Sequence, residues 1–314
     1  MIDALVQNSA ERVSGLRRHD FVRNFRRGLS LMLSERTTRI YGVFLLFILT
    51  LGLVGPWVAP YEYDQRMRGD DGGLLRIEEP SAAHPLGTTE QGFDVLSRVL
   101  YGARPTIVAG ILGGSMIIGI GLTIGLTAGY VGGRVDDVLM RFTDLIYGVP
   151  LIPATLVLIA LLGVGYFQAI FIIGALLWRG SARVIRSQAL QIRERPFILA
   201  AKATGASRPY IILKHILPNV APMAVLFFAL GMGYTIIVMA ALAFLGVADP
   251  FIPSWGVMIR NAYNSGVMGT AWFWALPPGF LISLTVLSLF MFGRGYENVV
   301  SGEDEGDQAL AQAT

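Results

Sequence analysis

IYGVFLLFILTLGLVGPWVA (residues 40–59) contains no charged side chain. A helix that crosses the hydrocarbon core of a bilayer needs roughly 20 predominantly apolar residues, so this stretch predicts a membrane span. Four further uncharged runs follow it, at 105–133, 145–178, 215–248 and 261–293. A soluble protein does not keep such runs, and they predict an all-α integral membrane protein.

The composition excludes several kinds of chemistry. The chain has no cysteine, so no disulfide, thiolate metal site or thiol nucleophile is available. Its three histidines are far apart, and neither of its two lysines follows a glycine, as the phosphate-binding loop of P-loop ATPases requires. The uncharged runs hold no carboxylates, which disfavours a self-powered transporter or a membrane enzyme. We therefore expect no catalytic residue, no metal site and no cofactor.

The third apolar run contains more than one span. Residues 145–178 are too many for one crossing, and Gly163-Val164-Gly165 interrupts them as a turn would. Pro150 and Pro153 are expected to kink the span before that turn, and Pro218 to open the fifth span. The prediction is a bundle of six spans, near 40–59, 106–130, 137–162, 166–185, 217–246 and 272–292.

Arginine and lysine orient this bundle. Of the 25 arginine and lysine residues, 19, including Arg179, fall on the side that holds both termini, and six fall on the other side. Cytoplasmic loops carry the excess of basic residues, so both termini are expected in the cytoplasm. The sequence thus predicts a multi-pass protein of the cell (plasma or inner) membrane that contacts lipid and no nucleic acid.

These spans divide the chain into five parts. The expected parts are a cytoplasmic Arg-rich tail (1–39), the first span (40–59), an external segment (60–101), a five-helix transmembrane domain (102–293) and an acidic, disordered cytoplasmic tail (294–314). The external segment ends in DVLSRVLYGAR (94–104), which predicts a short amphipathic helix lying at the membrane interface.

Gly121, Gly125 and Gly129 recur at every fourth position of the second span. Small residues at this spacing let two helix backbones approach closely in lipid. We expect this face to pack against another helix of the same chain, and a dimer face or a sliding surface remains an alternative.

LAAKATGASRPYIILKHILP (199–218) interrupts the apolar chain with small and basic residues. Pro196 suits the first position of a short helix, Gly205 suits its end, and Ser207 with Pro209 suits a second start. A short helix faced with alanine can dock into a groove of another protein. Its basic flanks equally favour a helix lying on the anionic cytoplasmic leaflet.

This segment, 195–218, resembles the EAA motif of ABC importer permeases, a short cytoplasmic helix that docks on the ATPase subunit. Ala200, Ala201, Gly205 and Pro218 match the motif. Leu199 replaces its leading glutamate, and His215 replaces its usual isoleucine. The resemblance implies that the ATPase-coupling residues are Leu199, Ala200, Ala201, Gly205, Ala206, His215 and Pro218.

Other motifs resemble the C-type permeases of dipeptide, oligopeptide and nickel ABC importers. They are HPLGTTEQGFDVLSRVLYGAR (84–104), AGYVGGRVDDVLMRFTD (128–144) and LAFLGVADPFIPSWGVMI (242–259). The chain departs from that family at Thr89, where an acidic residue is usual, and at Phe93, where a basic one is. FGRGYENVV (292–300) also replaces a GDGLRD-like sequence.

The resemblance implies the type I ABC importer permease fold and half of a transmembrane pathway for peptides. The implied partners are a second permease subunit, two ATPase subunits and an extracytoplasmic substrate-binding protein, with ATP hydrolysis in the ATPases. Nickel, glutathione or a sugar oligomer are alternative cargoes. A stand-alone secondary transporter or channel is the alternative of another class. The residues that line the pathway are not predicted.

Overall fold

The computed structural model describes residues 36–313 except 164 and 250, with side chains as far as Glu297. The Arg-rich tail expected at 1–39 therefore lies almost wholly outside the described residues. Every regular element in the described part is a helix, and β-pairing there is limited to isolated bridges between residues 66 and 94. The expected all-α class is confirmed.

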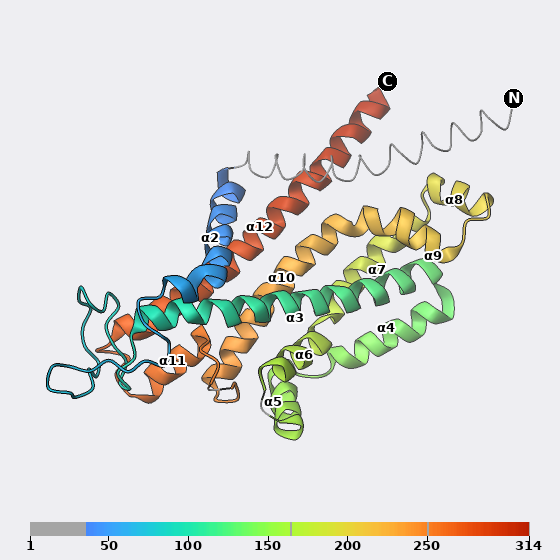
Figure 1. The fold of residues 1–314 in the computed structure, drawn as a ribbon. Helices are drawn as coiled ribbons and strands as arrows, with labels where there is room; N and C mark the ends of the chain where they lie inside the picture. The colour runs from blue at the N-terminus through green and yellow to red at the C-terminus, as the bar shows by residue number, and fades with distance from the viewer. Residues whose placement is uncertain (1–35, 164, 250, 314) are drawn as a thin grey trace, which may run out of the picture.

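In chain order the described helices are α2 (Arg36–Val58), α3 (Val95–Val131), α4 (Gly133–Tyr147), α5 (Leu151–Leu162), α6 (Tyr166–Leu177), α7 (Arg179–Arg193), α8 (Pro196–Ala203), α9 (Arg208–Ile211), the π-helical turn η1 (Ile212–Ile216), α10 (Leu217–Phe244), α11 (Trp255–Asn264) and α12 (Trp272–Ala313). The long helix α3 runs through the arrangement, and α2, α10 and α12 pack against it at an angle (Figure 1). Helix α3 also packs along α7. Residues 59–94 and α11 lie at one end of α3, and α8 and α9 lie at the other (Figure 1).

Four helices in the described residues are long and apolar enough to cross a membrane, and the number rises to six if two bent pairs each form one span. The pair α6 and α7 bends by 40°, and the pair α4 and α5 bends by 86°. The turn expected at Gly163 does separate α5 from α6. The expectation of one merely kinked helix over 137–162 is wrong, because α4 ends at Tyr147 and α5 starts only after Pro150, which cannot continue a helical hydrogen-bond ladder.

The segment 94–104 is the start of α3 rather than a separate interfacial helix. Asp94 caps α3, since its side chain accepts a hydrogen bond from the backbone N–H of Ser97. Val95, Val99 and Ala103 on the first turns are buried against Trp255 of α11 and its neighbours. Nε1 of Trp255 donates to the carbonyl of Val99 at 2.9 Å. This tertiary burial keeps the amphipathic turns in line with the span, so the expected surface position is corrected.

The two remaining differences concern helix ends. The acidic tail expected to be disordered continues α12 to Ala313, because its Ala, Gln, Glu and Leu residues favour helix and no proline interrupts them. The helix of the fifth span does not open at Pro218: α9, η1 and α10 run on without a break from Arg208 to Phe244.

Candidate functional site

Helix α8 stands at the end of the bundle opposite residues 59–94 (Figure 1). Pro196 occupies its first turn, where a missing N–H costs nothing, and Arg195 precedes it with extended backbone. Ile198 is the one α8 residue that is buried, at 0% exposure. Phe197 and Leu199, on either side of it, are 41% and 50% exposed. The helix is thus pinned to the bundle at one point and open on its other faces.

Gly205 ends α8 in a left-handed turn with φ +80°. The N–H of Gly205 donates to the carbonyl of Lys202, and the N–H of Ala206 donates to the carbonyl of Ala201. These two bonds define a Schellman motif, in which a glycine at this position avoids the steric cost of a side chain. Ala201 and Ala206, its hydrophobic pair, are both half-buried.

The anchor beneath α8 joins four helices. Ile198 packs in one cluster with Ile192 of α7, Ile211 of α9, Ile216 of η1 and Leu126 of α3. All of these side chains are apolar and buried, so the cluster connects α8 to the ends of these helices.

Two basic contacts reinforce the same anchor. Nζ of Lys202 lies 5.6 Å from the ring centre of Tyr130 on α3. Nη1 of Arg193 on α7 donates to the carbonyl of Gly129 at 3.2 Å. Both tie the region around α8 to the end of α3.

His215 and Pro218 lie beyond the Gly205 turn. The His215 ring is half-buried and sits 6.3 Å from the ring of Phe197 and 5.7 Å from that of Tyr210. It therefore links the start of α8 to the helix that leaves it. Pro218 is exposed and follows a wide turn in which the N–H of Leu217 donates to the carbonyl of Ile212. That π-turn makes room for the proline ring inside a continuous helix.

The predicted coupling residues differ in exposure. Leu199, Ala200, Gly205 and Pro218 are exposed, whereas Ala201, Ala206 and His215 are half-buried and hold the segment in place.

Gly121, Gly125 and Gly129 face α7. A Cβ built at Gly121 would lie 2.1 Å from Oγ of Ser181, and one at Gly125 would lie 2.6 Å from the carbonyl oxygen of Ala182. A Cβ at Gly129 would lie 2.7 Å from that of Ala189. The three glycines thus lie where α3 and α7 approach most closely within this chain.

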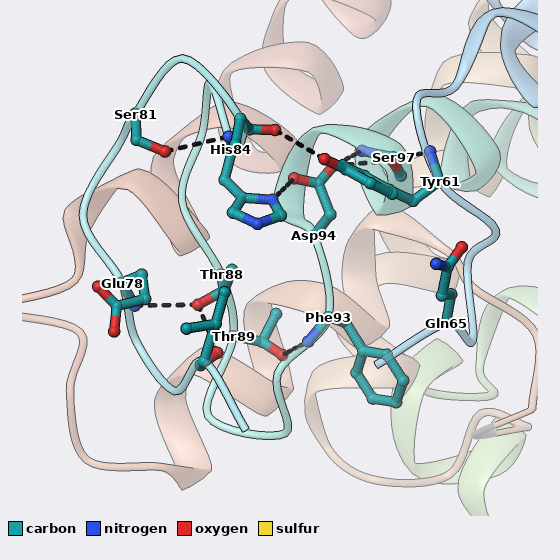
Figure 2. A network of polar contacts seen from close by, with 12 residues as sticks. Tyr61, Gln65, Glu78, Ser81, His84, Thr88, Thr89, Phe93, Asp94 and Ser97 are labelled. Atoms are coloured by element: carbon teal, nitrogen blue, oxygen red, sulfur yellow. Dashed lines mark hydrogen bonds and ion pairs between the residues drawn. The ribbon is translucent and has the colours of Figure 1, made fainter. Parts of the chain in front are cut away.

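A polar network at the other end of the bundle escaped sequence reasoning (Figure 2). Nδ1 of His84 lies 3.0 Å from Oδ1 of Asp94, and both residues are buried. Oδ2 of Asp94 accepts from the N–H and the hydroxyl of Ser97, both at 2.7 Å, and Oγ of Ser97 accepts from the N–H of Tyr61. The network fastens residues 59–94 to the start of α3. An aspartate three residues before Ser97 is the local signal of a helix N-cap.

The departures at Thr89 and Phe93 belong to the same region. The N–H of Phe93 donates to Oγ1 of Thr89, and the N–H of Thr89 donates to the carbonyl of Phe93. The Phe93 ring lies under Arg98, whose Cζ is 4.2 Å from the ring centre. A neutral turn and a cation–π contact thus occupy the positions of the family's usual charged residues.

Arg179 is the second feature that sequence reasoning missed. Counting charges places it on the cytoplasmic side, but it lies at the junction of α6 and α7, midway along a bent pair that counts as one span. Its Nη1 donates to the carbonyls of Ile146 and Val149, at 2.8 and 3.4 Å, where α4 breaks off. The signal in the sequence is its distance of only 14 residues from Gly165, less than one span.

Comparison with known proteins agrees with these motifs. Residues 121–298 match the family model described as "Binding-protein-dependent transport system inner membrane component". The dipeptide transport system permease protein DppC of Bacillus subtilis is 32% identical over 271 residues, which cover 85% of this chain and 82% of the relative. The glutathione transport system permease protein GsiD of Pectobacterium atrosepticum is 33% identical over 263 residues, which cover 82% of this chain and 84% of the relative.

Among solved structures, a chain of the MetNI methionine ABC transporter in an inward-facing conformation is similar, with a TM-score of 0.48 and 19% identity over 64% of this chain and 96% of that one. The family match covers more than half of this chain, and the relatives cover more than four-fifths of it. The resemblance inferred from the motifs is confirmed: the chain belongs to the family of binding-protein-dependent transport system inner membrane components, the permease subunits of ABC importers.

Proposed function

We propose that this permease forms half of the transmembrane pathway of an importer of short peptides. In this proposal α8 contacts a separate ATPase and transmits its conformational change to the permease. The cargo class rests on the relatives, whose names specify dipeptides and glutathione, both short peptides. The family requires a complex with ATPase subunits, since the chain itself has no phosphate-binding loop. A second permease, two ATPases and an external binding protein complete the proposed assembly.

The observation that carries the coupling role is the way α8 is held. Ile198 anchors it, while Phe197, Leu199, Tyr210 and Leu213 around it are 41–60% exposed. Exposed apolar side chains gathered at one end of a protein mark a site for another protein. If α8 instead lay on the membrane surface, lipid would cover the same apolar side chains. A helix with that role needs no rigid link to α3 and α7. The cluster beneath α8 supplies such a link.

The coupling residues have separate roles in this proposal. Leu199, Ala200 and Gly205 form the contact with the ATPase, and Leu199 makes an apolar contact where the motif's glutamate would make a polar one. Ala201 and Ala206 close the Schellman turn, and His215 with Pro218 direct the chain into α10. Movement of α8 as a rigid body then tilts the helices around the pathway.

The charges and the arrangement of the helices both support the proposed orientation in the membrane. The basic residues near α8 favour a cytoplasmic location for that end. Residues 59–94 lie at the opposite end of α3 (Figure 1), which suits them to meet an external binding protein. Both termini are then cytoplasmic, and the transmembrane domain is 102–293.

The decisive experiment is reconstitution of the permease with its co-encoded second permease, ATPases and binding protein in liposomes. Uptake of radiolabelled dialanine that requires ATP inside the liposomes and the binding protein outside supports the proposal. Uptake by this chain without the ATPases identifies an autonomous carrier and refutes it. Competition by glutathione, nickel or a sugar oligomer separates the alternative cargoes.

A further inference from the structure

Arg179 lies near the middle of the bent pair α6 and α7. The helices α3 and α7 run side by side in the same direction, because Gly121 meets Ser181 and Gly129 meets Ala189. At a rise of 1.5 Å per residue, Arg179 is about 20 Å from Tyr166 at one end of the pair and about 20 Å from Arg193 at the other. An ionisable side chain inside a membrane span is costly unless it faces water, protein or a bound ion, and it usually marks a transport pathway.

Arg179 differs from its neighbours on α7 in having no carboxylate partner. Arg183 pairs with Asp144, and Arg186 pairs with both oxygens of Asp136. Within the described residues, Arg179 contacts only the carbonyls of Ile146 and Val149, through Nη1, and the face of Tyr147.

The remaining donors of Arg179 are its Nε and Nη2 groups, which present the geometry that binds a carboxylate through two parallel hydrogen bonds. The two carbonyls fix the guanidinium in place and neutralise none of its charge.

The same side chain lines a cavity that is open at one side. The cavity has a volume of about 200 Å³ and lies between α3, α4, α6, α7 and α10. Its walls include Tyr147, Arg179, Ser181 and Tyr234. The two tyrosines are 40% and 51% exposed, and their rings offer both apolar faces and hydroxyl groups. A cavity of this size has room for a carboxylate group but not for a whole peptide, so it suits one end of a ligand.

We propose that Arg179 forms a carboxylate-binding subsite at the midpoint of the transport pathway, which engages the C-terminal carboxylate of a passing peptide. The proposal rests on the proposed function and deepens it, because it assigns a chemical group of the cargo to a residue.

The absence of native cysteine allows a direct test of the field in the cavity. Tyr234→Cys places a single thiol in the wall, and the complete importer, without ATP, is labelled with a negatively charged (sulfonatoethyl) or a positively charged (trimethylammonium-ethyl) methanethiosulfonate. Each rate is divided by the rate of the same reagent with a free thiol, because the cationic reagent reacts intrinsically faster with a thiolate. With Arg179 present, the normalised anionic-to-cationic ratio should be about tenfold above one, because a fixed positive charge in the same cavity attracts the anionic reagent. Adding Arg179→Gln should bring the normalised ratio close to one.

Two further variants guard this result. Arg186→Gln, two turns along α7 and paired with both oxygens of Asp136, should leave the ratio unchanged. Arg179→Lys should keep the charge preference but lose the bidentate geometry. In uptake assays, wild type should be inhibited by free dialanine more strongly than by its C-terminal amide in the presence of saturating binding protein. Arg179→Gln should lose most of that difference.

Three outcomes overturn the proposal. One is an equal reagent ratio with and without Arg179, and another is a thiol at position 234 that neither reagent reaches in the assembled importer. The third is an Arg179→Gln importer that still discriminates the acid from the amide as wild type does. The labelling needs no ATP and no transport, so the subsite can fail in an importer that works, and failure of ATP-driven uptake in wild type refutes the proposed function instead.

Discussion

Gly205→Glu tests whether the exposed end of α8 is the ATPase contact. A Cβ at Gly205 has no heavy atom within 4 Å, so the new side chain meets open space inside this chain. The backbone there has φ +80°, and an L-residue in this region costs about 1–2 kcal/mol. Because a folded domain is held by roughly 5–15 kcal/mol, the variant should insert and fold.

The expected effect on the ATPase contact is much larger than the effect on folding. A glutamate at this position brings an unpaired carboxylate into the proposed interface, and an uncompensated buried charge costs about 3–5 kcal/mol. At 1.4 kcal/mol for each tenfold change, binding of the ATPase should weaken by at least about a hundredfold. ATP-driven uptake should be abolished with it.

The matched control is Gly266→Glu. Gly266 also has a positive φ, +71°, and no heavy atom within 4 Å of a built Cβ. It follows α11, at the opposite end of the bundle from α8 (Figure 1). The two variants therefore carry the same strain and the same charge in different places.

The assay is co-purification of the ATPase with tagged permease, with ATP hydrolysis measured on the same material. Gel filtration and thermal unfolding report folding. Gly205→Glu should lose the ATPase while Gly266→Glu retains it, with similar unfolding temperatures. Retention of the ATPase by Gly205→Glu, or equal loss from both variants, would refute the coupling role of α8.

Three further predictions concern packing and the external segment. Gly125→Ala should lower the free energy of unfolding in detergent by about 1–3 kcal/mol relative to Gly119→Ala. The reason is that a Cβ at Gly125 meets the backbone of α7, whereas one at Gly119 has no heavy atom within 4 Å. Equal thermal unfolding of the two variants would contradict this. Asp94→Ala should cost about 1–2 kcal/mol and speed hydrogen exchange across 59–94, since the cap of α3 and the partner of His84 are both lost; unchanged exchange would count against it. Trp255→Phe should destabilise by about 1–3 kcal/mol, because the buried carbonyl of Val99 loses its donor; denaturation of the purified complex measures this, and a neutral result would show that the bond is dispensable.

Local sequence signals located the two ends of α8. Pro196 and Gly205 mark the two ends of α8 because each suits one end of a helix through its own backbone. The resemblance to a family of importers was likewise available from short motifs, since those residues lie close together in sequence. The continuity of α9 with α10 was not predicted, because a π-turn depends on how the whole helix is packed.

The apolar composition by itself determined that this chain is a helical membrane protein, because several uncharged runs of about 20 residues would be unfavourable in contact with water. The turn at Gly163 was also predicted from the sequence, whereas the full break between α4 and α5 before Leu151 was not. The tertiary structure alone decided that α4 and α5 meet at 86°, that α3 extends back to Val95, and that its glycines face α7. It also placed Arg179 at the junction of α6 and α7, where its hydrogen-bond partners among the described residues are the carbonyls of Ile146 and Val149. The physical reason is that hydropathy is a property of each segment, whereas the direction of a break, the partner of a face and the counter-ion of a charge depend on residues distant in the chain.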